Sequence, residues 1–197
     1  MIYSIDSEKQ QMLTAKIGNK IYYGCSQKWY PSFIQRLAGC GPTAASNLFA
    51  CINNPPFANK AQRLVVMQDL WLYVTPGIYG LDSVDDFAGG SNRFFKDKDL
   101  PYECVSLKYP DDEKPPFDAV KEFLKTALSD NCPVAFMNLS NGAIEELEQW
   151  HWVTVVSFDD QTNAITVFDA NKKFEMDLKL WHDTTTRRAG FARFKNK

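Results

Sequence analysis

The chain has 197 residues and a formal net charge of -2, from 22 basic and 24 acidic residues. Hydrophobic residues make up 45% and charged residues 23%, the balance of a soluble globular protein whose length suffices for one domain with a substantial core. The low net charge excludes a strong non-specific attraction to nucleic acid, and no apolar run approaches the roughly 20 residues that span a bilayer.

The N-terminal segment MIYSIDSEKQ lacks the basic and apolar regions of a signal peptide, so we expect a cytoplasmic protein with no membrane partner. The five cysteines are scattered and include no CxxC pair, which argues against a disulfide framework and against a thiolate zinc site. We expect neither a metal nor an organic cofactor, since the chemistry of a cysteine and a histidine proposed from the motifs needs none.

Helical patterns dominate the first part of the chain. A strand pair over residues 15–24 turns at Gly18 and Asn19. Helices are predicted for residues 41–52, 60–74, 83–97 and 115–128, and a strand is predicted for residues 102–109. Gly89 and Gly90 are expected to weaken the middle of the third helix.

Strand patterns dominate the rest of the chain. They cover residues 133–139, 151–158, 164–170, 173–178 and 190–194, with a short helix at 178–182. Residues 159–163 join two of these strands as a hairpin. Helices followed by an antiparallel sheet are typical of the α+β class, and we predict a single domain over residues 1–197.

The segment LAGCGPTAASNL places Cys40 at the start of a predicted helix. The unpaired N–H groups and the dipole of a helix N-terminus favour a thiolate there, and Gly39 and Gly41 leave the approach to the sulfur open. Cys40 is therefore the candidate nucleophile. We expect the other cysteines to pack in the core, namely Cys25, Cys51, Cys104 and Cys132.

A nucleophilic cysteine needs a base and a group that orients the base. His151 opens the strand HWVTVVSF, and Asp169 ends the strand ITVFDAN across the hairpin turn, so the pair is expected to lie side by side. Asn171, of the same strand parity, is the alternative orienting residue. His182 lies in a polar segment and is expected at the surface.

Two further features surround these residues in the sequence. Gln35, five residues before Cys40, is the candidate oxyanion donor together with the backbone N–H of Cys40. Trp150 and Trp152 flank His151, and within a strand both would point away from it. One of them could shield the ion pair from water, or both could belong to the core.

Taken together, Gln35, GCGPTAASNL, HWVTVV and ITVFDAN resemble the papain-like cysteine peptidases, and most of all their C39-type, bacteriocin-processing branch. The resemblance implies that Cys40 is the nucleophile, His151 the general base, Asp169 its orienting residue and Gln35 the oxyanion donor. The glutamine of that family usually lies six positions before the cysteine, where this chain has Ile34.

The resemblance implies a papain-like fold, with the nucleophile at a helix start packed on a C-terminal antiparallel sheet. It also implies a cysteine peptidase that acts on a peptide or protein substrate through a thioester. Two alternatives remain open from the residues: acyl transfer to an amine, as in transglutaminase-like relatives, and a catalytically idle domain that binds peptides.

Overall fold

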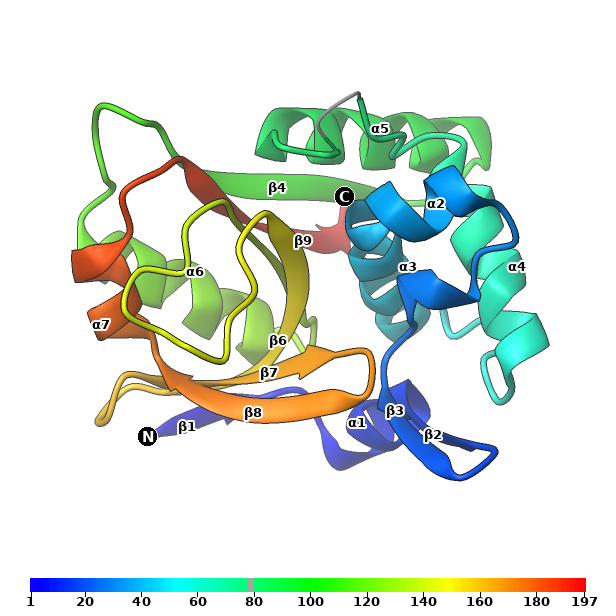
Figure 1. Ribbon diagram of the computed structural model, residues 1–197, viewed down its shortest axis with the longest axis horizontal. Coiled ribbons are helices and arrows are strands. Elements are labelled where there is room, and N and C mark those ends of the chain that lie inside the picture. The colour runs from blue at the N-terminus through cyan, green and yellow to red at the C-terminus, as the bar shows by residue number, and fades with distance from the viewer. Residues whose placement is uncertain (78–79) are drawn as a thin grey trace.

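The computed structural model describes residues 1–77 and 80–197, in which a group of helices lies beside a curved antiparallel sheet (Figure 1). The helices are α1 (Ser7–Leu13), α2 (Phe33–Ala38), α3 (Cys40–Asn53), α4 (Lys60–Trp71), α5 (Val84–Asp97), α6 (Phe117–Ser129) and α7 (Leu178–Thr184), with a 3-10 turn at Gln27–Trp29. The strands are β1 (Ile2–Ser4), β2 (Thr14–Ile17), β3 (Lys20–Tyr23), β4 (Tyr102–Tyr109), β5 (Val134–Asn138), β6 (His151–Asp159), β7 (Ala164–Asp169), β8 (Lys172–Asp177) and β9 (Ala189–Asn196). The predicted α+β class is confirmed.

The main sheet has the strand order β4-β9-β5-β6-β7-β8, and β2 and β3 form a separate hairpin. The first part of β6, from His151 to Val155, pairs with β5. The last part of β6, from Ser157 to Asp159, pairs with β1. β5 and β1 therefore lie one after the other along the same edge of β6, and the N-terminal residues are part of the main sheet.

Helix α3 lies at the centre of the fold, between the sheet and α4 (Figure 1). All its residues from Cys40 to Cys51 are buried. The buried amide of Asn47 donates from Nδ2 to Thr154 Oγ1 on β6 (3.0 Å), and its Oδ1 accepts from the backbone N–H of Cys25 (2.8 Å). A buried amide that is hydrogen-bonded at both its nitrogen and its oxygen specifies how the helix sits against the sheet.

The elements predicted from the sequence are found within about three residues of their expected bounds. Helix α5 runs without a break through Gly89 and Gly90. A Cβ at Gly90 would collide with the backbone carbonyl of Tyr73, so the glycine allows α5 to pack closely on the chain that follows α4. The sequence analysis missed β1, α1 and α2, which are all short.

Arg63 on α4 fastens the N-terminal segment to the helices. Its side chain is 1% exposed, and its guanidinium donates to four backbone carbonyls at 2.7 to 2.9 Å: those of Met12, Leu13, Gly24 and Phe57. Burial lowers the pKa of Arg63. The carbonyl dipoles therefore stabilise a cation that has no carboxylate within 4 Å among the residues described.

Candidate active site

Cys40 is the first residue of α3, as the sequence predicted, and Gly39 separates it from α2. A side chain at position 39 would collide with the backbone carbonyl of Gln35 and with the ring of Tyr30. A side chain at position 41 would collide with Leu81. The two glycines thus allow a sharp turn between helices and close packing beside the sulfur. The backbone N–H of Cys40 lies in the first turn of α3, where it has no intrahelical acceptor.

His151 and Asp169 are in direct contact, with Nε2 of the imidazole 3.0 Å from Oδ1 of the carboxylate. A β-bulge at Val156 makes this possible, because the register of β6 and β7 shifts between Val155 and Ser157. The last pair before the end of β7 is Thr154 with Phe168, and the same register continued by one residue puts Asp169 level with Val153, on the same sheet face as His151. Without it, Asp169 would lie opposite Thr154, on the other face.

The turn after β7 places the two candidate orienting residues, Asp169 and Asn171, in different surroundings. Ala170 and Asn171 form the tight connection between Asp169 and Lys172, which are paired across the β7–β8 hairpin. Asn171 is exposed in that connection, whereas the side chain of Asp169 is 16% exposed. Of the two residues, Asp169 is the one that contacts the imidazole.

The surroundings of His151 favour its charged form. Burial by itself lowers the pKa of the imidazole, but the hydrogen bonds and charges of Asp169 and Cys40 outweigh burial and raise the pKa of His151 to about 10. Because Nε2 faces Asp169, Nδ1 is the ring nitrogen left for Cys40. The arrangement can hold an imidazolium between a sulfur and a carboxylate.

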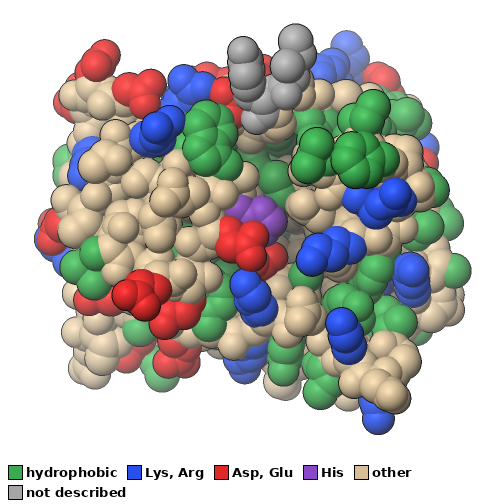
Figure 2. Space-filling model, in the orientation of Figure 1, with side chains coloured by type: hydrophobic (Ala, Val, Ile, Leu, Met, Phe, Trp, Pro, Cys, Tyr) green, Lys and Arg blue, Asp and Glu red, His purple; other side chains and the backbone are tan. Residues whose placement is uncertain are grey.

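A cavity of about 330 Å³ opens beside the sulfur, and we call it the Cys40 cavity. Its lining is mostly apolar and consists of Leu37, Ala38, Cys40, Gly80, Leu81, Asp82, Leu139 and Trp150. Figure 2 shows a histidine side chain in a hollow of the molecule, with hydrophobic side chains on both sides of it. Such a cavity can exclude water from a reacting thiolate while admitting an extended chain.

The backbone is strained on both sides of the His151–Asp169 pair. Among the described residues that are neither glycine, asparagine nor aspartate, Trp150 and Ala170 alone have a positive φ, at 55° and 52°. Trp150 directly precedes His151, and Ala170 directly follows Asp169. Left-handed backbone costs free energy for such residues and concentrates at functional sites.

The two tryptophans that flank His151 have different roles. Trp152 is 3% exposed, stacks on Phe87 with ring centroids 4.5 Å apart, and donates to the carbonyl of Leu81 (2.6 Å). Trp150 precedes the strand, is 46% exposed and lines the Cys40 cavity. Its place in the cavity wall was not predicted, because strand alternation does not apply to a residue outside the strand.

Gln35 lies on α2, and its side chain is engaged elsewhere. Its Nε2 donates to Gln68 Oε1 on α4 at 2.9 Å, and the reverse contact from Gln68 Nε2 measures 3.4 Å. The structure thus brings Cys40, His151 and Asp169 together, while the Gln35 amide faces α4.

Asn138 is a residue of this region that the sequence analysis did not single out. It is fully buried opposite His151 in the β5–β6 pairing and donates from Nδ2 to the backbone carbonyl of His151 (3.3 Å). This hydrogen bond holds the backbone of His151 against β5. The only sequence signal was an asparagine at the end of an otherwise apolar strand.

The other cysteines are buried thiols, as predicted. Burial raises the pKa of Cys25 to about 12 and that of Cys132 to about 11, and it also raises the pKa of Cys51 and Cys104. These groups are kept neutral by the apolar core and are poor nucleophiles.

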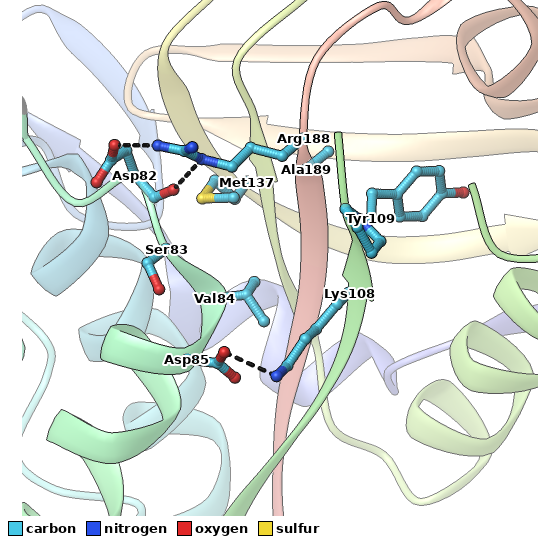
Figure 3. Close-up of a pocket in the computed structure, with 10 residues that line it drawn as sticks. Asp82, Ser83, Val84, Asp85, Lys108, Tyr109, Met137, Arg188 and Ala189 are labelled. Atoms are coloured by element: carbon cyan, nitrogen blue, oxygen red, sulfur yellow. Dashed lines mark hydrogen bonds and ion pairs between the residues drawn. The ribbon is translucent and has the colours of Figure 1, made fainter. Parts of the chain in front are cut away.

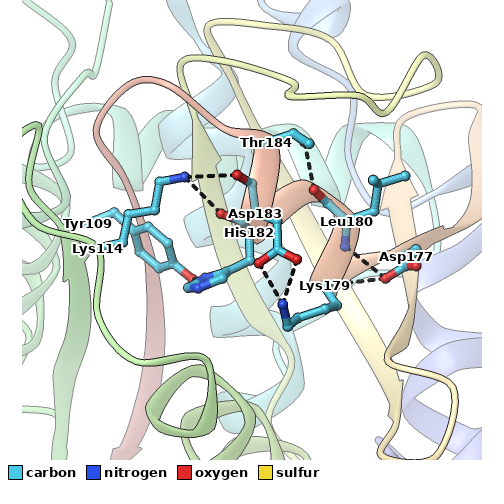
Figure 4. Close-up of polar contacts among 8 residues, drawn as sticks. All are labelled: Tyr109, Lys114, Asp177, Lys179, Leu180, His182, Asp183 and Thr184. Carbon is cyan, nitrogen blue, oxygen red and sulfur yellow. Dashed lines mark hydrogen bonds and ion pairs between the residues drawn. The ribbon is translucent and has the colours of Figure 1, made fainter.

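His182 differs from its expected place at the surface. It is half-buried on α7, and its Nδ1 lies 2.8 Å from the hydroxyl of Tyr109, a buried residue of β4 (Figure 4). Burial lowers the pKa of His182. The surroundings of His182 therefore favour the neutral imidazole, whereas those of His151 favour the charged form.

A second cavity, of about 360 Å³, adjoins the first and shares Asp82 with it. The Arg188 guanidinium pairs with the Asp82 carboxylate at 2.5 Å and also donates from Nε to the Asp82 carbonyl (Figure 3). This pair joins the segment before β9 to the segment before α5.

Across residues 1–77 and 80–197, no group of three or more histidine, cysteine or acidic side chains could hold a metal ion. Within the same residues, no helix has the length and apolar character needed to cross a membrane.

Comparisons with known proteins complement this geometry. No protein-family model matches the chain, and no curated protein matches its sequence. Solved structures do match. UfSP from C. elegans matches all of this chain with 10% identity and a TM-score of 0.56, and the match covers 34% of the UfSP chain. The chain therefore spans about a third of that protein.

Two peptidase domains match 80% of this chain. One is a double glycine motif protease from an AMS/PCAT transporter, solved in complex with the leader peptide, with 10% identity, 84% of that chain covered and a TM-score of 0.44. The other is the peptidase domain of Streptococcus ComA, with 14% identity, 92% covered and a TM-score of 0.42. The match to UfSP covers the whole of this chain and shows that the chain has a papain-like α+β fold, in which α3 packs on the antiparallel sheet.

Proposed function

We propose that the chain is a cysteine peptidase in which Cys40 is the nucleophile, His151 the general acid and base, and Asp169 the residue that orients His151. The observation that carries the proposal is the 3.0 Å contact between His151 and Asp169 beside Cys40, which favours an imidazolium. A thiolate next to an imidazolium is the reactive form of a catalytic cysteine.

The reaction begins when the Cys40 thiolate attacks the carbonyl carbon of a peptide bond. The carbonyl oxygen becomes an oxyanion, and the Nδ1 proton of His151 passes to the leaving nitrogen as the C–N bond breaks. The product amine leaves, and a thioester joins Cys40 to the acyl fragment. His151, now neutral, takes a proton from water, which attacks the thioester and releases a carboxylic acid and the Cys40 thiolate.

The oxyanion needs hydrogen-bond donors where it forms. The backbone N–H of Cys40 is one, since it lies in the first turn of α3. The Gln35 amide is the second donor that we propose, as its resemblance to the family's glutamine implies. It would have to exchange its bond to Gln68 for one to the substrate.

The surface beside the cavity supports a polypeptide substrate. Three large apolar side chains on α2 are about 70% exposed: Phe33, Ile34 and Leu37. Leu37 belongs both to this surface and to the Cys40 cavity. An exposed apolar surface continuous with a cavity is typical of a binding site for a chain longer than the reacting bond.

Alkylation with iodoacetamide at pH 6 tests the proposed nucleophile. We expect rapid modification at Cys40, a large loss of rate in His151→Ala, and slow modification of the four buried cysteines, with Cys51 as the internal reference. Modification of Cys40 no faster than that of Cys51 would rule out an activated nucleophile and leave only a peptide-binding domain.

Digestion of a peptide library tests the reaction itself. Cleavage by the chain and its absence in Cys40→Ser would support the peptidase, whereas identical cleavage patterns would mean that the activity came from elsewhere. Adding a primary amine to the same digestion distinguishes hydrolysis from transfer, because a transferase would form an amide with the added amine.

A further inference from the structure

The segment between α7 and β9 brings two consecutive arginines to the edge of the Cys40 cavity, and the two are used differently. Arg188 forms ion pairs with Asp82 (2.5 Å) and Asp111 (3.5 Å). Arg187 is exposed, and its guanidinium carbon lies 5.5 Å from the centre of the Trp150 ring. Within residues 1–77 and 80–197, no carboxylate lies within 4 Å of the Arg187 guanidinium.

The contact between Arg187 and Trp150 ties this cation to the proposed catalytic residues. Trp150 lines the Cys40 cavity and is the residue directly before His151. A guanidinium that lies over an aromatic ring uses its face for that contact and keeps the N–H groups at its edge free. Those groups have the geometry that binds a carboxylate through two parallel hydrogen bonds.

The residues on either side hold Arg187 in place. Thr185 donates from Oγ1 to the carbonyl of Ser140 (3.1 Å), directly after the cavity residue Leu139. On the other side, the backbone N–H of Arg188 donates to Asp111 Oδ1 (2.8 Å). With its backbone fixed at both ends, Arg187 loses less conformational entropy on binding than a side chain of a free loop would.

The charges around the cavity leave Arg187 uncompensated. Asp82, the acidic residue of the cavity lining, is neutralised by Arg188. Glu148, in the loop before Trp150, is paired with Lys172 at 3.1 Å. The positive charge over Trp150 is therefore available to a ligand.

We propose that Arg187, held over Trp150, binds a carboxylate of the substrate next to the scissile bond, so that this site prefers peptides with an acidic group there. The proposal rests on the proposed function, in that it names the substrate class of the same site. The carboxylate can belong to an aspartate or glutamate side chain or to a peptide C-terminus.

Capture of synthetic peptides by the immobilised Cys40→Ala chain tests this preference without any turnover. One library of acetylated hexapeptides has amidated C-termini and all side chains, so only aspartate and glutamate supply carboxylates. A second library has free C-termini and lacks both acidic residues. Enrichment from the first library identifies a side-chain carboxylate, and enrichment from the second identifies a terminal one.

We expect at least one library to yield a pool enriched in its carboxylate, and the additional change Arg187→Gln to reduce that enrichment roughly tenfold. Arg187→Glu should reverse the selection toward lysine and arginine. Arg93→Gln, which changes an exposed arginine on α5, is the matched control and should leave the selection unaltered. Equal enrichment with and without Arg187, or no enrichment from either library, would overturn the proposal.

Iodoacetamide labelling of the Arg187→Gln chain, with Cys40 restored, separates the two proposals. Normal labelling of Cys40 combined with unchanged peptide selection would refute the role of Arg187 alone. If Cys40 of the unaltered chain is labelled no faster than Cys51 while peptide capture still depends on Arg187, the proposed peptidase is refuted and the carboxylate site is retained.

Discussion

The charge on His151 provides the most direct test of the candidate site. In Asp169→Asn, a carboxylate is replaced by a neutral amide of nearly the same shape, so the change removes a charge without opening a cavity. Because Asp169 is a principal cause of the raised pKa of His151, we expect that pKa to fall.

The size of the fall follows from the contact distance. With charges 3.0 Å apart and an effective dielectric constant of about 20, Coulomb's law gives about 5.5 kcal/mol, or about four pKa units, as an upper limit. The two side chains are 14% and 16% exposed, so water screens part of this interaction. We therefore expect the pKa of His151 to drop from about 10 by roughly two units or more.

Titration of the imidazole C–H resonances by NMR measures this drop, and the chain suits the method because it has two histidines. His182 is the internal control. Its pKa is lowered by burial beside Tyr109 rather than set by Asp169, so it should be the same in both proteins. A change of less than one unit at His151, with His182 unaltered, would refute the ion pair as the source of the raised pKa.

Three predictions concern stability and are checked by urea or thermal unfolding. Because the native pKa of His151 lies above its ordinary value of 6.5, the ion pair contributes fully below about pH 6.5 and is lost as the pH rises through about 10. The unaltered chain should therefore lose more unfolding free energy between pH 7 and pH 10 than Asp169→Asn, and parallel profiles would contradict this. Ala170→Gly should raise the unfolding free energy by about 0.5–1 kcal/mol, because glycine adopts the φ of 52° without strain, whereas Ala164→Gly within β7 should lower it. Arg63→Met should lower it by about 3–5 kcal/mol, because four carbonyls lose a buried cation. Arg93→Met, at the surface, should change it by less than about 0.5 kcal/mol, and equal effects of the two arginine changes would contradict the role assigned to Arg63.

Strong periodicity explains which elements were predictable. The strand at residues 102–109 and the helix at 83–97 have patterns long enough to establish both type and length. Helix α2 lacked such a signal, because it has six residues and its apolar side chains Phe33, Ile34 and Leu37 face solvent rather than the core. Strand β1 has three residues, and its pairing with the end of β6 depends on a partner more than 150 positions away.

The local chemistry could be predicted from the sequence: a thiol at a helix start between two glycines, and a histidine at the start of a strand. The sequence also suggested Asp169 as the partner of that histidine, with Asn171 as the alternative, but which of the two contacts the imidazole depends on the register of the sheet. Side chains alternate between sheet faces with a period of two, so the single extra residue Val156 moves Asp169 to the face of His151. Contacts with Gln68 and Trp150 likewise decided where Gln35 and Arg187 point, because these contacts join segments that no local pattern relates.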